Sequence, residues 1–140
     1  MIDVSGDIGA LLAELTEIFA RVYLANAHDG LTTIVFIHGV TSLTALGNII
    51  PYISETSARS ALRYAWQSGC ALYACFGISG MAEDVEPCTQ NSELLIGRAL
   101  AHGDEHVIKF TEACLRRDAL VPSPAYRAAV EHALDTVPRR

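Results

Sequence analysis

Apolar residues recur at intervals of three and four positions through most of the chain, which is the spacing of helices packed on one another. No segment alternates apolar and polar residues as a half-buried strand does. Between about residues 7 and 27, one helix face collects Ile8, Leu11, Leu12, Leu15, Ile18, Phe19 and Val22. The chain is therefore predicted to be an all-α compact bundle of about five helices, with residues 1–140 forming a single helical domain.

Short breakers separate the predicted helices and mark their ends. The expected boundaries are a second helix from Thr32 or Thr33 towards Ile50, a third from Thr56 or Ser57 to about Phe76, a fourth from Asn91 or Ser92, and a last helix from Ser123-Pro124 to about Thr136. At Gly103 two outcomes are open. Either the fourth helix continues, or it stops there and Asp104 caps a new helix.

The composition bears on the partners of the chain. Hydrophobic residues make up 51% and charged residues 19%, so part of the apolar surface is expected to meet another chain in a homodimer or hetero-complex. The net charge of -6, without a basic stripe, argues against a nucleic-acid partner.

No run approaches the roughly 18 apolar residues of a membrane span. The acidic start, with Asp3 and Asp7, is unlike a signal peptide, so no membrane partner and a cytoplasmic location are expected.

Four cysteines occur without a Cys-x-x-Cys pair, so a thiol redox pair or a zinc ribbon is not indicated. They are predicted to be buried free thiols, at Cys70, Cys75, Cys88 and Cys114.

Lys109 is the single lysine of the chain, and it follows two histidines. On one continuous helix, His102, His106 and Lys109 would share a face, where the two imidazoles could bind one metal ion. A lysine belongs beside a metal only if it is neutral or has become a carbamate, which ligates as a carboxylate does. The simpler interpretation is an ion pair between Lys109 and Glu105, four residues earlier.

His38 lies in an apolar segment, Phe36–Thr41, that is predicted to be helical. A histidine in such a setting is often a core residue whose ring is hydrogen-bonded to a backbone carbonyl. In this segment, Thr41 is the alternative partner. The following Gly39 allows a helix, a ligand or a substrate to approach closely.

Several segments in order resemble the C-terminal part of questin oxidase-like proteins. They are Phe36–Leu43 with Leu46, Ile50–Tyr52, Leu62–Gln67 and Asp104–Lys109, and the resemblance covers roughly residues 33–117. It implies an all-helical fold and a non-haem iron held by histidines and a carboxylated lysine. It also implies oxidative ring opening of an anthraquinone-type polycyclic aromatic polyketide with dioxygen, as a Baeyer–Villiger-type oxygenation or a carbon–carbon cleavage.

On this resemblance His38, His106 and Lys109 become candidate ligands, with His102 as a neighbour, and Lys109 and His38 candidate catalytic residues. The expected cofactors are iron and NADPH. An aromatic small molecule would be bound by Phe36, Thr41, Tyr64, Trp66 and Tyr73. The aromatic residues among these are equally compatible with an ordinary core.

One departure affects the expected site. Questin oxidase-like proteins are longer, and their N-terminal part supplies further histidines, so a second subunit, His28 or His132 would have to complete the ligand set. Two other functions stay open. One is a non-catalytic helical partner subunit or remnant domain that dimerises or docks onto a larger protein, and the other is a small ligand-binding protein without metal.

Overall fold

The computed structural model describes residues 2–139, which form six α-helices, one 3-10 helix and no β-strand. The elements are α1 (Ile8–Asn26), α2 (Gly30–Ile49), η1 (Ile50–Tyr52), α3 (Glu55–Phe76), α4 (Ser92–His102), α5 (Glu105–Leu120) and α6 (Pro124–Thr136). The all-α prediction is confirmed. The count is six because the chain breaks at Gly103, whose backbone takes the left-handed conformation that ends α4.

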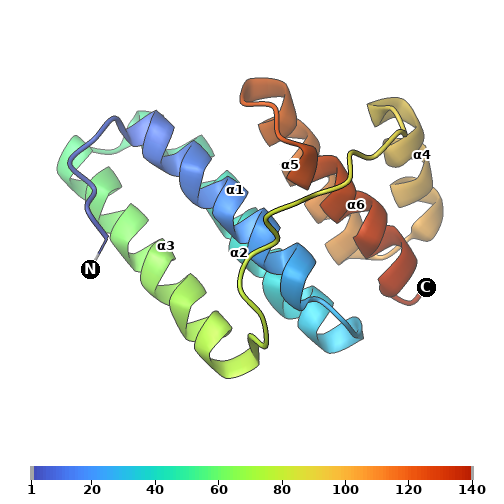
Figure 1. The fold of residues 1–140 in the computed structure, drawn as a ribbon. Helices are drawn as coiled ribbons and strands as arrows, with labels where there is room; N and C mark the ends of the chain where they lie inside the picture. Colours follow the sequence, from blue (N-terminus) through green and yellow to red (C-terminus); the bar gives the residue numbers. More distant parts are fainter. Residues whose placement is uncertain (1, 140) are drawn as a thin grey trace.

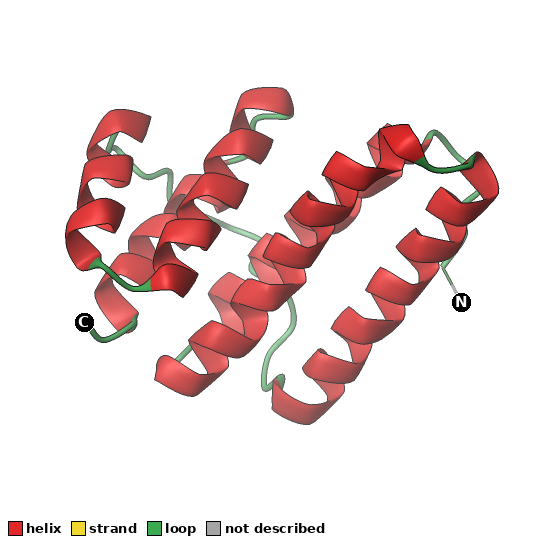
Figure 2. Ribbon diagram, turned by 180° about the vertical axis from the view of Figure 1, so that it is seen from behind, coloured by secondary structure: helices red, strands yellow, loops and turns green. Residues whose placement is uncertain are grey.

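The helices are arranged around the pair α1 and α2, which lie side by side (Figure 1). Helix α3 packs on one side of this pair, whereas α5 and α6 pack on the other side. Helix α4 lies outermost, against α5 and α6, and the view from behind shows the same order (Figure 2). A long loop, residues 77–91, passes across α1 on its way from α3 to α4 (Figure 1).

Each α-helix begins at a side chain that accepts a hydrogen bond from a free backbone N–H of the first turn. These N-caps are Asp7, Asp29, Ser54, Asn91, Asp104 and Ser123. Ser123 was expected from the sequence, and Asp104 was one of the two alternatives left open there. The third helix begins before the predicted Thr56 or Ser57, because the Ser54 hydroxyl accepts from Ser57 N–H.

Helix α2 is the most central element, since it contacts α1, α3 and α5. Gly30–Tyr52 is also the one helical stretch among the described residues that has the length and apolar composition of a membrane span, and 33% of its most apolar window is buried. The packing of α2 against α1, α3 and α5 covers part of this apolar surface.

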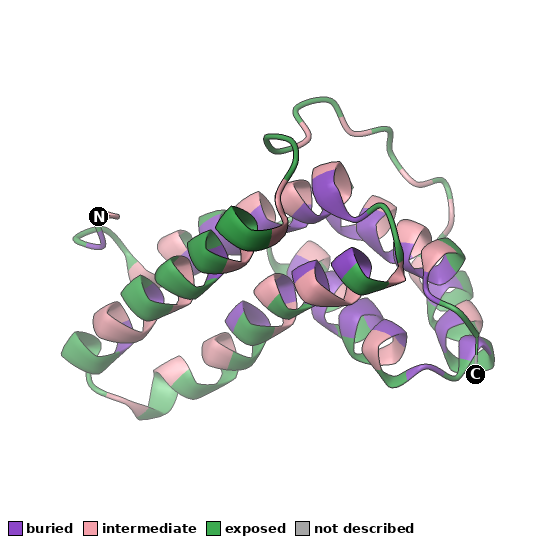
Figure 3. Ribbon diagram, turned by 90° about the horizontal axis from the view of Figure 1, so that it is seen from below, coloured by how far each residue is buried: buried purple, intermediate pink, exposed green. Residues whose placement is uncertain are grey.

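Helix α3 buries the fewest residues for its length, which are Ala58, Leu62 and Gly69. Exposed residues run along its outer side (Figure 3). The prediction of buried thiols is therefore wrong for Cys70 and Cys75, which are exposed on α3, and right for Cys114, which is buried in α5. Cys88, in the loop, is partly buried.

Tyr23 of α1 and His132 of α6 link the first and last helices within the core. The Tyr23 hydroxyl lies 2.9 Å from Nδ1 of His132, and the Tyr23 ring packs on Phe110 with ring centres 4.9 Å apart. Burial lowers the pKa of His132 below its usual 6.5, while the charge of Asp135 partly opposes this shift. The folded protein therefore favours the neutral imidazole.

This lowered pKa predicts a pH-dependent stability. Below pH 6.5 the unfolded chain binds a proton at His132 more readily than the folded protein does, so stability is lost as the pH falls through the folded pKa. The urea midpoint of the wild type should fall between pH 7.5 and pH 5. It should fall less in His132→Gln, whose side chain does not titrate. Equal falls in the two proteins would contradict the prediction.

Candidate histidine pair between α2 and α5

The packing of α2 against α5 brings His38 and His106 together. Their ring centres are 5.8 Å apart, and the ring planes make an angle of 62°. His38 lies on the exposed side of α2, and His106 is half-buried in the first turn of α5. Two histidines that are 68 positions apart in the sequence thus face each other across a helix interface.

In both rings one nitrogen is occupied by an acceptor from the protein. Nδ1 of His38 lies 2.6 Å from the carbonyl oxygen of Ile34, and Nδ1 of His106 lies 3.2 Å from Oδ1 of Asp104. A carbonyl oxygen and a carboxylate can only accept, so Nδ1 carries the proton in each neutral ring. Nε2 of both rings is then left with a lone pair that can bind a metal ion, as in metal sites whose histidines are oriented by an outer acceptor.

The distance between the two ring centres can be compared with the distance expected for two imidazoles that bind the same metal ion. Two imidazoles that bind one ion at about 2.0–2.1 Å have ring centres roughly 4.5–5.5 Å apart. The observed 5.8 Å is within a small side-chain movement of that range. Among the described residues, however, no group of three or more His, Cys, Asp or Glu side chains is placed to hold a metal. The pair would therefore supply two ligands at most, which is not a complete set.

His102 does not join this pair. The break at Gly103 separates it from the face of α5, and its ring is buried. Its Nε2 donates to the carbonyl oxygen of Val137 at 2.9 Å, while Nδ1 accepts from the backbone N–H of Asp104 at 3.4 Å. Both nitrogens hold backbone groups, so His102 connects α4 to the end of α6. The arrangement of His102, His106 and Lys109 on one continuous helix does not occur.

Lys109 is one turn beyond His106, with its side chain 66% exposed. Its Nζ donates to Oε2 of Glu105 at 2.7 Å, which is the ion pair that the simpler interpretation of the sequence expects. A surface pair of this kind contributes a few tenths of a kcal/mol at most. The carboxylated form of Lys109 stays a prediction.

A pocket of about 420 Å³ lies beside His38, between α2 and α5. His38, Thr41 and Lys109, three of the predicted site residues, line it together with Asn48 and Glu112. The Thr41 hydroxyl donates to the carbonyl oxygen of Ile37 and keeps its lone pairs for another group. The lining therefore offers hydrogen-bonding groups next to His38.

The remaining residues predicted to bind substrate do not reach this pocket. Phe36 belongs to the buried core, and Tyr64 is exposed on α3. Trp66 and Tyr73 line a different pocket, between α1, α3 and the 77–91 loop. His28 and His132 also lie elsewhere, at the turn before α2 and in contact with Tyr23.

The sequence identified Asp104 as an N-cap and missed its second role. Oδ1 of this buried carboxylate accepts from both the backbone N–H and Nδ1 of His106. The spacing Asp-x-His at a helix start allows both bonds, and it is the signal that could have revealed this role. The hydrogen bond between His38 Nδ1 and the Ile34 carbonyl joins residues four positions apart, which lie one turn apart on the helix.

No family model matches the chain, and neither a curated protein nor a solved structure was found to be similar to it.

Proposed function

We propose that this domain binds a divalent metal ion through His38 and His106 and is part of an oxygenase-like protein. The observation that carries the proposal is the pair of facing rings whose Nδ1 atoms are held by Ile34 and Asp104, which leaves both Nε2 atoms to bind metal. Neutral imidazoles with open positions around the metal suit ferrous iron.

Iron bound in this way would bring dioxygen next to an electron-rich substrate. The Thr41 hydroxyl can accept from a phenol hydroxyl in the adjoining pocket, and the Asn48 amide can donate to a phenol or quinone oxygen, which would orient the ring relative to His38. Asp104 and the Ile34 carbonyl hold the ligand rings in place. The substrate class, a polycyclic aromatic polyketide opened oxidatively, is proposed from the resemblance to questin oxidase-like proteins, as is NADPH.

The His, Cys, Asp and Glu side chains of the described residues do not complete the ligand set around His38 and His106, so other groups must supply the remaining ligands. A carboxylated Lys109, a second subunit or a separate chain with further histidines could supply them. If a second subunit or a separate chain supplies them, the active species is a homodimer or a hetero-complex.

Ferrous ion titrated anaerobically into the protein, followed by calorimetry, tests the metal site. We expect saturable binding that is at least about ten-fold weaker in both His38→Ala and His106→Ala, as expected for the loss of one of two ligands. His28→Ala is the matched control, because this exposed histidine lies at the turn before α2. No binding by the wild type, or an equal loss in His28→Ala, would overturn the proposal.

Lys109→Arg separates the two interpretations of the lysine. Arginine keeps the positive charge and the ion pair with Glu105, but it does not form the carbamate. Because Nζ contacts Glu105 in the structure, we expect Lys109→Arg to bind ferrous ion as the wild type does. Loss of binding would identify the carboxylated lysine as a ligand.

A second candidate function is a helical partner subunit without catalysis of its own. Helix α4 favours it, because Leu94, Ile96 and Leu100 are all exposed on this helix. Light scattering coupled to size exclusion distinguishes the two functions when it is combined with the metal titration. A stable oligomer without ferrous ion binding would support the partner subunit.

A further inference from the structure

We propose that the pocket between α1, α3 and the 77–91 loop binds a small flat aromatic molecule of one or two fused rings. The pocket has a volume of about 230 Å³, and Phe19, Trp66, Tyr73 and Met81 form much of its wall. It is formed by elements other than α2 and α5, which carry the histidine pair. The inference therefore does not depend on the proposed metal site.

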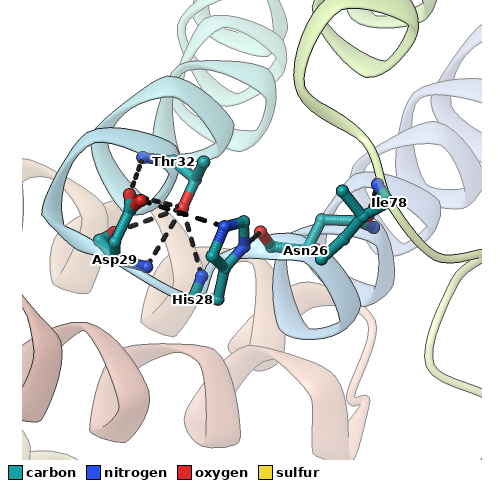
Figure 4. Close-up of polar contacts among 5 residues, drawn as sticks. All are labelled: Asn26, His28, Asp29, Thr32 and Ile78. Carbon is teal, nitrogen blue, oxygen red and sulfur yellow. Dashed lines mark hydrogen bonds and ion pairs between the residues drawn. The ribbon is translucent and has the colours of Figure 1, made fainter.

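The loop that closes the pocket is fixed by Asn26, a buried residue of α1. Oδ1 of Asn26 accepts from the backbone N–H groups of Ile78 and Ser79 at 2.8 and 2.9 Å (Figure 4 draws the contact with Ile78). Its Nδ2 donates to the carbonyl oxygens of Gly80 and Val22. The amide thus uses all its hydrogen-bonding capacity, and it holds the start of the loop in one conformation.

Three further hydrogen bonds hold the same segment. Nη1 of Arg21 donates to the carbonyl oxygens of Ala82 and Glu83, and the Tyr73 hydroxyl donates to the carbonyl oxygen of Ser79. The backbone polar groups of the loop are directed to these partners. The pocket is therefore formed before any ligand arrives, and its lining is left mainly apolar.

The absence of side chains at two glycines shapes the pocket. At Gly69 a Cβ atom would collide with the Phe19 ring, so glycine allows α3 to approach α1 closely. At Gly80 a Cβ atom would meet no atom within 4 Å, so this part of the rim stays open. The volume exceeds the roughly 150 Å³ cavity that holds benzene in an engineered core, and it suits one ring or two fused rings.

The aromatic walls favour a flat ligand over a branched aliphatic one. Phe19 and Trp66 stack with ring centres 6.2 Å apart and an angle of 29° between planes. A planar ring can extend such a stack, and the flexible thioether of Met81 can adjust to its edge.

Trp66 is the only tryptophan of the chain, so its fluorescence reports on this pocket directly. We would titrate the full chain with coumarin, a neutral molecule of two fused rings, and correct the signal for coumarin absorption. The expected result is a saturable change in Trp66 emission. The variants Gly80→Leu and Val22→Phe, which add volume at the pocket lining, should weaken this binding at least about ten-fold.

Gly97→Leu is the matched control, since Gly97 also faces open space but lies on α4. It should bind coumarin as the wild type does, and so should His106→Ala, which keeps this test independent of the metal site. A change in Trp66 emission that does not saturate as coumarin is added to the wild type would overturn the inference. Equal weakening in Gly97→Leu, or full binding in both filling variants with the fold intact by circular dichroism, would also overturn it.

Discussion

Leu62→Ala is expected to lower the free energy of unfolding by about 3 kcal/mol, as for other fully buried leucines. Leu62 is completely buried, and it is the only large residue among the three that α3 buries. Because α3 packs against α1 and α2 and not against α5 or α6, few other contacts compensate for the lost side chain. Equilibrium urea denaturation, with the fluorescence of Trp66 on α3 as the signal, measures the change.

Leu100→Ala provides the matched control for this prediction. Leu100 is a leucine in the interior of a helix as well, but its side chain is 64% exposed on α4. Its replacement should change the free energy of unfolding by less than about 0.5 kcal/mol. If both variants lost similar stability, or if Leu62→Ala cost less than about 1 kcal/mol, α3 would not be held in the way described.

Arg117→Met is expected to raise the free energy of unfolding by about 1–3 kcal/mol. Arg117 is only 9% exposed and forms no ion pair with the described residues. Its Nε has no hydrogen-bond partner, and Nη2 has one weak contact, 3.5 Å from the carbonyl oxygen of Leu43. Burial lowers the pKa of this guanidinium, which shows that the charged form is disfavoured there. Methionine keeps an unbranched chain of similar length and removes the charge.

Arg116→Met separates this effect from the general loss of an arginine. Arg116 is about half exposed, forms an ion pair with Glu112 and donates to Asn48. Its replacement is expected to change the stability in urea by less than about 0.5 kcal/mol or to lower it slightly. A loss of stability in Arg117→Met would show that the buried guanidinium contributes more than its missing partners suggest.

The helices could be predicted because their signals are local. Apolar periodicity and the cap Ser123 gave the helix positions to within a few residues, and Asp104 was one of two alternatives at the start of α5. The start of the third helix was misplaced because Ser54, Thr56 and Ser57 are all acceptable caps, and only the backbone geometry selects Ser54. The break after His102 was left open by the sequence and was decided by Gly103, which takes the left-handed backbone that glycine adopts most readily.

The candidate site could be predicted only in part, because it depends on which helix faces pack together. Spacing along one helix grouped His102 with His106, whereas the fold places His106 opposite His38. Trp66 and Tyr73 were assigned to the same site as His38. The burial of Leu62 and Gly69 instead fixes the rotation of α3 and turns Trp66 and Tyr73 towards α1 and the loop. No local pattern determines such a rotation.

The contact between Tyr23 and His132 joins residues 109 positions apart, and it has a consequence for the order of folding during synthesis. Helix α1 leaves the ribosome before α6, so the face of α1 that packs on α6 stays uncovered until α6 has been made. The closing of this long chain segment costs entropy that only the completed core offsets. While it is being made, the chain therefore exposes the apolar face of α1 to chaperones and to other nascent chains.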